Sequence, residues 1–156
     1  MNRRDSYMLH FISLVLGFLP LAVGGIIYLA FRPLNLRMFS WITFLHLDDS
    51  IDRLRANLGP ASLPSWTVFA LPDGLWLLSF LMVILLLWHF EVHRAIPYMV
   101  PLCLIALGSE IGQLFGWVPG HFDLVDIGVY LLAIIISAIS TVIIKTYRKQ
   151  LNTKIL

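Results

Sequence analysis

Four long apolar stretches dominate this chain of 156 residues and leave few folds open to it. They run from about 9 to 31, 71 to 90, 96 to 116 and 124 to 146. A bilayer core about 30 Å thick needs about 20 apolar residues in a helix, so each stretch is long enough to cross it. Helices are the expected form because unpaired backbone groups cannot face lipid and the stretches lack the alternation of barrel strands. We therefore predict an all-α membrane protein with four transmembrane helices.

Composition agrees with this class. Hydrophobic residues make up 59% of the chain and charged residues 13%, whereas about half of a soluble domain is apolar and about a quarter is charged. The length suits one compact bundle, so we predict that residues 1–156 form a single domain. The first apolar run lacks a small-x-small cleavage site, and we expect it to be a retained helix. Membrane orientation explains the net charge of +2, so we predict no nucleic-acid partner.

The distribution of basic residues predicts the orientation, because Lys and Arg are enriched on the cytoplasmic side of a membrane. Seven lie on one predicted side and four on the other. The first set is Arg3, Arg4, Arg94, Lys145, Arg148, Lys149 and Lys154, and the second is Arg32, Arg37, Arg53 and Arg55. We therefore predict cytoplasmic termini and an outward-facing connection between the last two helices.

The first outer loop, about residues 32 to 70, has the composition of a folded segment. Residues 36–47 are too apolar for free solution and too short to cross the membrane, which predicts an interfacial or re-entrant helix. Residues 48–55 have acids first and arginines later, and Gly59 follows. This order is typical of a short helix.

A polar cluster begins near the outer end of the third stretch with Glu110 and Gln113. Glu110 precedes Trp117 by seven positions, which places it about 10 Å inside the hydrocarbon zone. An acid there costs at least about 2.5 kcal/mol, so it usually marks a site or a pathway. Gln113 lies one turn on and shares its face. In a functional interpretation the cluster exchanges protons or binds a cationic group, and in a structural one it joins helices through hydrogen bonds.

The fourth stretch opens with Asp123 and Asp126, which allow two interpretations. Asp123 suits the N-cap of the helix, with Asp126 at its third position. Alternatively, Asp123, Asp126 and Tyr130 share one helical face directed toward Glu110. His121 can change its charge near neutral pH and could serve as a gate or a second acid-base group, or be simply solvated. The spacing matches no known metal site, so we predict neither a metal nor another cofactor.

Other polar residues carry weaker signals. Arg32 can reach from the outer interface to pair with the acids or with a lipid phosphate. Asp73 begins the second stretch, where an acid near a helix start needs no function. Small residues predict close helix packing. They are Gly17, Gly24, Gly25, Ala133, Ser137, Ser140 and Thr141.

Residues 109 to 130 resemble the signature of VanZ-like membrane proteins. That signature has Glu and Gln three apart, a Pro-Gly turn, and two Asp three apart at the start of the last helix. It matches Glu110, Gln113, Pro119-Gly120-His121, Asp123 and Asp126. Two positions depart from it: His121 replaces the usual Arg, and Asp73-Gly74 replaces the usual Asp-Lys. The resemblance implies a bacterial inner-membrane protein of the cell envelope, in a family of which some members are linked to glycopeptide antibiotic tolerance.

Together these features predict an outward-facing acidic cavity that binds or modifies a lipid-linked or amphiphilic substrate. In this hypothesis Glu110, His121 and Asp126 are the reactive groups, and whether catalysis occurs is left open. The predicted substrate contacts are Gln113, Asp123, Tyr130 and Arg32. One alternative is a small transporter or proton path, motivated by the same acid. Another is a structural subunit whose apolar outer loop docks a membrane protein partner.

Overall fold

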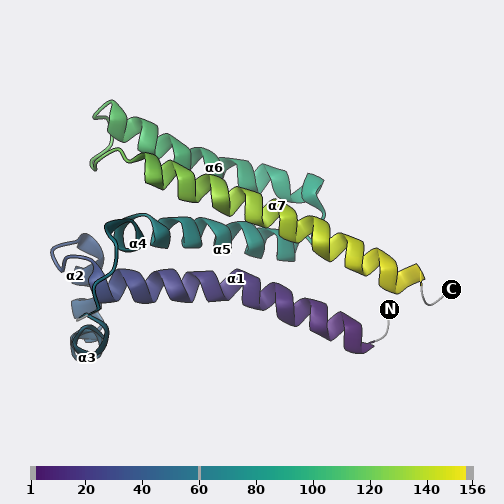
Figure 1. The fold of residues 1–156 in the computed structure, drawn as a ribbon, viewed down its shortest axis with the longest axis horizontal. Coiled ribbons are helices and arrows are strands. Elements are labelled where there is room, and N and C mark those ends of the chain that lie inside the picture. Colours follow the sequence, from purple (N-terminus) through teal and green to yellow (C-terminus); the bar gives the residue numbers. More distant parts are fainter. Residues whose placement is uncertain (1–2, 60, 154–156) are drawn as a thin grey trace.

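The computed structural model describes residues 3–59 and 61–153, and within these ranges it contains seven helices and no strand. The helices are α1 (Arg3–Phe31), α2 (Arg37–Phe44), α3 (Asp48–Leu58), α4 (Ser65–Phe69), α5 (Leu71–Leu87), α6 (Val92–Leu114) and α7 (Leu124–Thr153). The four longest run alongside one another, with α2, α3 and the α6–α7 connection at one end of the molecule (Figure 1). The start of α1 and the end of α7 lie at the opposite end. The predicted all-α class is confirmed.

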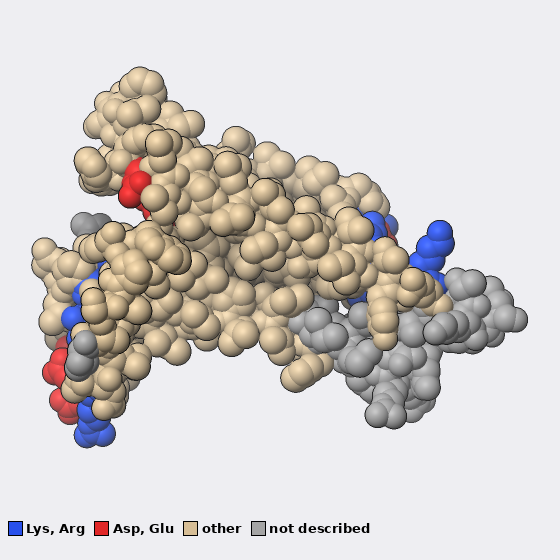
Figure 2. All heavy atoms as spheres, viewed as in Figure 1, with Lys and Arg blue, Asp and Glu red and all other residues tan. Residues whose placement is uncertain are grey.

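Three of the helices are long and apolar enough to cross a membrane: α1, α6 and α7. The fourth long helix, α5, has 17 residues and is apolar but shorter. On the face shown in Figure 2, Lys, Arg, Asp and Glu side chains gather at the two ends of the molecule and the middle is uncharged. This banding is typical of a protein that crosses a bilayer.

The second and third stretches have different bounds from those predicted. The second ends at Leu87 rather than at 90, because the chain turns through His89 and Phe90, whose φ angles are 50° and 64°. Arg148 of α7 holds this turn by donating to the His89 carbonyl oxygen (2.8 Å). The third helix begins at Val92 rather than at 96. Such non-glycine residues at positive φ depend on tertiary contacts, which a local sequence pattern does not show.

Helix α5 is the centre of the bundle and packs against α1, α6 and α7. Its side chains Leu81, Met82 and Leu85 are at most 1% exposed. Leu81 joins a core cluster with Tyr130 and Ala133 of α7. A helix that is apolar on all sides is expected to be buried, and here the shortest of the four long helices packs against the other three, with Phe80 left half-exposed at the side of the bundle.

Small residues let α1 approach α5 closely, as predicted. A Cβ at Gly24 would lie 2.8 Å from the indole nitrogen of Trp76, and the Ser79 hydroxyl donates to the Gly17 carbonyl oxygen. Gly25 has open space around its Cβ position, so the packing prediction is wrong for that residue. On α7 the predicted small residues are buried or half-buried. They are Ala133, Ser137, Ser140 and Thr141.

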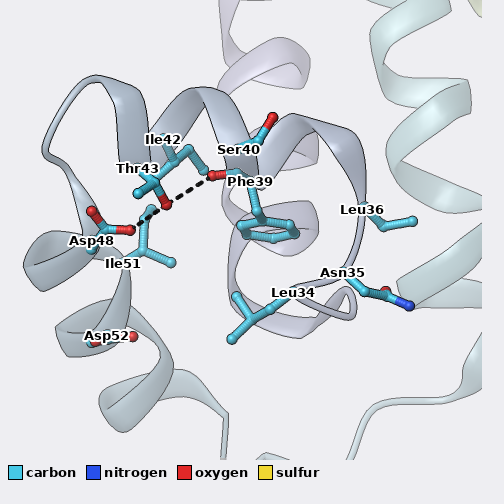
Figure 3. A pocket seen from close by; sticks show the side chains of 10 residues that line it. All are labelled: Leu34, Asn35, Leu36, Phe39, Ser40, Ile42, Thr43, Asp48, Ile51 and Asp52. Carbon is cyan, nitrogen blue, oxygen red and sulfur yellow. Dashed lines mark hydrogen bonds between the residues drawn. The ribbon is translucent and has the colours of Figure 1, made fainter.

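The loop after α1 folds into α2 and α3. Phe39 is buried and stacks on Tyr28 of α1 with ring centroids 6.3 Å apart, whereas Phe44 is 82% exposed. At the corner between the two helices, the Thr43 hydroxyl lies 2.7 Å from Asp48 Oδ1 and 3.3 Å from the Phe39 carbonyl oxygen (Figure 3). Helix α2 thus turns one apolar face toward α1 and another outward.

Candidate functional site

A cavity of about 520 Å³ opens at the end of the bundle where α4 and the α6–α7 connection lie. Ligand sites usually measure about 300–1,000 Å³. Figure 2 shows acidic atoms on the wall of a hollow at this end of the molecule. Six of the seven predicted site residues line the cavity, and Tyr130 does not. The full lining is Arg32, Ser65, Trp66, Phe69, Ala70, Asp73, Glu110, Gln113, Gly120, His121, Asp123, Val125 and Asp126.

Glu110 is the most buried acid of the site. It is 3% exposed, although it lines the cavity. Gln113 Nε2 donates to Glu110 Oε1 over 3.3 Å, so the two side chains share a face as predicted. The second oxygen, Glu110 Oε2, is buried and has no hydrogen-bond partner. Because a buried acceptor without a partner is costly, this oxygen is suited to receive a donor from a ligand.

The two aspartates at the start of α7 have different surroundings. Asp123 Oδ1 accepts a hydrogen bond from the Val125 backbone N–H over 2.9 Å, and α7 begins at the next residue. The predicted N-cap is therefore confirmed. Asp126 lies within the first turn and lines the cavity, and its Oδ1 is buried without a partner. Asp123 is already satisfied by the backbone, whereas Asp126 has an acceptor to offer.

Arg32 crosses from the end of α1 to the first turn of α5. Its Nη2 donates to the Phe69 carbonyl oxygen (2.7 Å) and lies 3.5 Å from Asp73 Oδ2. Its guanidinium carbon also lies 5.2 Å from the ring centre of Tyr28 and 4.9 Å from that of Phe69. These contacts fix Arg32 as part of the cavity wall. The positive charge of Arg32 is paired with the carboxylate of Asp73.

Asp73 is the site residue that sequence reasoning missed. We attributed it to the helix start, yet it lines the cavity together with Glu110 and Asp126. One sequence signal could have found it, since it occupies the outer end of an apolar stretch, at the same level as the predicted acidic cluster. Locating it required knowing that α5 lies between α1 and α7.

The α6–α7 connection closes over Gln113. Gly116 and Gly120 have positive φ angles of 70° and 144°. A Cβ at Gly120 would lie 2.6 Å from the side-chain amide carbon of Gln113. His121 follows, is exposed and lines the cavity. Gly120 is therefore needed both for its backbone conformation and for the close approach to Gln113.

We expect Gly120→Ala to destabilise the protein by about 1–3 kcal/mol, because Gly120 has a positive φ angle and an added Cβ would meet Gln113. The new methyl group must displace Gln113, which then no longer supports Glu110. Thermal unfolding of the purified protein in detergent would measure the loss of stability. Gly25→Ala is the matched control, because its Cβ position is open. Unchanged stability of Gly120→Ala would contradict the close approach.

Tyr130 does not line the polar cavity and belongs to the adjoining core. It is 7% exposed and belongs to the core cluster between α5 and α7. It also lines a separate groove together with Asp73 and Ser109. Among residues 3–59 and 61–153, no group of three or more His, Cys, Asp or Glu side chains is arranged to hold a metal ion.

Comparisons with known proteins do not assign a family. No protein-family model matches the chain, and neither a curated protein nor a solved structure matches it. The cavity is therefore the main indication of function in this protein. The cavity offers hydrogen-bond acceptors near the ends of apolar helices, and the one arginine in its lining is paired with Asp73.

Proposed function

We propose that this protein binds an amphiphile in the membrane, with the polar head of the ligand in the cavity at Glu110 and Asp126. The observation that carries the proposal is the pair of buried, unpartnered carboxylate oxygens, Glu110 Oε2 and Asp126 Oδ1, in one cavity. Carboxylates accept hydrogen bonds, and those from charged donors are the strongest. An ammonium or hydroxyl-bearing head is therefore favoured over a purely anionic one.

We further propose that four segments cross the membrane. Helix α5 alone is about 25 Å long at 1.5 Å per residue, close to the thickness of the bilayer core. Ala70 joins α4 to α5, because its N–H donates to the Trp66 carbonyl oxygen (2.9 Å) and its own carbonyl oxygen accepts from the Gly74 N–H (3.3 Å). In this arrangement α1, α6 and α7 face lipid and α4–α5 lies among them.

The proposed orientation places the cavity on the outer side and the termini in the cytoplasm. The end opposite the cavity carries Lys and Arg side chains, blue in Figure 2. Arg94 and Arg148 lie at the turn between α5 and α6, where they contact Glu91 and His89. The side chains of Arg3, Arg4 and Arg37 and the whole of Lys154 lie outside the described part of the structure. Helix α2, with Trp41 69% exposed, would then lie in the outer interface, where aromatic residues are favoured.

The resemblance to VanZ-like proteins fits this proposal. The residues that carry it, Glu110, Gln113, His121, Asp123 and Asp126, come together at one cavity. A bacterial inner-membrane location and an envelope amphiphile as ligand are therefore part of the proposal. If the ligand is also modified, Glu110 is the group placed to exchange a proton, and exposed His121 is a second acid-base group at the cavity.

The core beneath the cavity favours binding over conduction. Leu77, Leu81 and Ala133 pack with Tyr130 directly below the polar residues. Further along α7, the Thr141 hydroxyl donates to the Ser137 carbonyl oxygen of its own helix (2.8 Å) rather than to a neighbouring one. A proton path needs polar groups that continue through the bundle. A cavity that ends at this apolar core suits a ligand whose polar head is held near the outer end of the bundle.

Native mass spectrometry of the protein extracted from bacterial membranes tests the proposal. We expect the wild type to retain an amphiphile with an ammonium or hydroxyl head, and the double variant Glu110→Gln/Asp126→Asn to lose it. Glu91→Gln is the control, because Glu91 forms its ion pair with Arg94 (3.0 Å) in the turn between α5 and α6, away from the cavity. Equal retention by all three proteins would overturn the proposal.

A further inference from the structure

We infer that the amphiphile reaches the cavity sideways from the bilayer and that one of its alkyl chains lies in a groove between α5 and α6. This inference rests on the proposed function and names the route and the chain position of the ligand. The groove has a volume of about 270 Å³ and shares one lining residue, Asp73, with the polar cavity. Its lining changes from polar to apolar along its length.

The apolar part of the groove is built from the membrane-spanning parts of two helices. Trp76 and Phe80 come from α5, and Leu102, Ile105 and Ala106 come from α6. Phe80 is 51% exposed and Ile105 is 69% exposed, so this part is open at the side of the bundle. In the proposed orientation these side chains face the hydrocarbon of the bilayer, which is the usual surrounding of an alkyl chain.

The polar part of the groove meets the cavity at Asp73, which lines both. Ser109 and Glu110 are neighbours on α6; Ser109 lines the groove and Glu110 the cavity. From Ser109 to Leu102 the helix advances by about 10 Å. A ligand whose head contacts Glu110 could therefore extend its chain past Asp73 and along α6 without crossing the core.

An alkyl chain fits this groove better than a protein partner does. Nine residues line it, whereas a stable protein interface needs about 20–30 residues on each side. A helix from a second copy would also cover Asp73 with apolar side chains, and removing a charged group from water is costly even when it has an ion-pair partner such as Arg32. A ligand with a donor-bearing head and a flexible chain satisfies both parts of the groove.

Photolabelling tests this route. The probe is a phosphatidylethanolamine with a diazirine in its acyl chain, present in nanodiscs of phosphatidylcholine that contain the protein. We expect residues 76–80 and 102–106 to be labelled about tenfold more than the outer face of α7, as an affinity difference of about 1.4 kcal/mol would give. Ala106→Trp should reduce labelling in the groove to the level of α7. Leu132→Trp should leave labelling in the groove unchanged, because Leu132 lies on α7 and its side chain is 56% exposed.

The variant Ile105→Trp provides a second test should Ala106→Trp fail to fold, because the Ile105 side chain is at the open edge of the groove. Equal labelling of the groove and α7 in the wild type, or labelling that Trp at 105 or 106 does not change, would overturn the inference. If only the route is wrong, native mass spectrometry should show lipid retained by the wild type and lost from Glu110→Gln/Asp126→Asn. If the proposed function itself is wrong, retention will not depend on these two carboxylates.

Discussion

Replacing Glu110 with Gln is expected to weaken amphiphile binding by about 10- to 100-fold. A hydrogen bond to a charged group contributes about 1.5–3 kcal/mol, and each 1.4 kcal/mol is a factor of ten in affinity. The substitution keeps the size of the side chain and an oxygen that can accept the Gln113 bond (3.3 Å). It removes the charge available to a ligand ammonium group. Isothermal titration with a short-chain phosphatidylethanolamine would measure the change.

The same variant separates a binding site from a structural hydrogen bond. If Glu110 serves the ligand, the unfolding temperature in detergent should stay within a few degrees of the wild type, since Gln keeps the size of the buried side chain and an oxygen for the Gln113 hydrogen bond. Glu110→Asp keeps the charge but shortens the side chain, and we expect it to bind more tightly than Glu110→Gln. A large fall in unfolding temperature together with unchanged affinity would instead support the structural subunit.

The sequence predicted the parts of this structure that depend on local rules. Apolar length predicted the four long helices, and the cap preference of aspartate predicted the start of α7 at Asp123. The three-residue spacing of Glu110 and Gln113 predicted their shared helical face. Each of these features depends on a few neighbouring positions. The grouping of Glu110 and Asp126 in one cavity also followed, because a short connection brings the ends of α6 and α7 together.

The remaining features depend on contacts between distant segments. Asp73 joins the site because α5 lies between α1 and α7. Its place at the outer end of an apolar stretch indicates its level in the bundle but not its neighbours. The α5–α6 turn begins early because Phe90 is fully buried at positive φ beneath the guanidinium of Arg148. Likewise, Gly25 matches the small-residue pattern but faces open space. Pattern alone does not distinguish a packed glycine from an unpacked one.

Hydrogen bonding separates the acids of the cavity into two groups. Asp123 accepts from the helix backbone and Asp73 faces Arg32, so both have partners within the protein. Glu110 and Asp126 each keep one buried oxygen without a partner. Residue type is therefore a poor guide to function here. The unpartnered oxygens of Glu110 and Asp126 indicate where a ligand would bind, whereas Asp73 and Asp123 stabilise the protein around the cavity.

Arg32→Ala is expected to destabilise the protein by about 2–4 kcal/mol, because removal of one partner leaves a largely buried charge unpaired. Asp73 would lose its ion pair (3.5 Å), and the Phe69 carbonyl oxygen would lose its donor (2.7 Å). Arg32→Lys should recover only part of the stability, since Lys keeps the charge but lacks the planar fork that stacks on aromatic rings. Arg53→Ala, on the exposed face of α3, is the control.

Thermal unfolding in detergent can be followed through the reaction of Cys103 with a thiol-sensitive fluorophore, because it is the only cysteine of the chain and is half-buried in α6. The double variant Arg32→Ala/Asp73→Asn should unfold at a higher temperature than Arg32→Ala alone, since it removes the charge that the first change leaves unpaired. An Arg32→Ala protein as stable as Arg53→Ala would show that the pair does not stabilise the cavity. A double variant no more stable than the single one would place the role of Arg32 in its contacts with Phe69 and Tyr28 rather than in its charge.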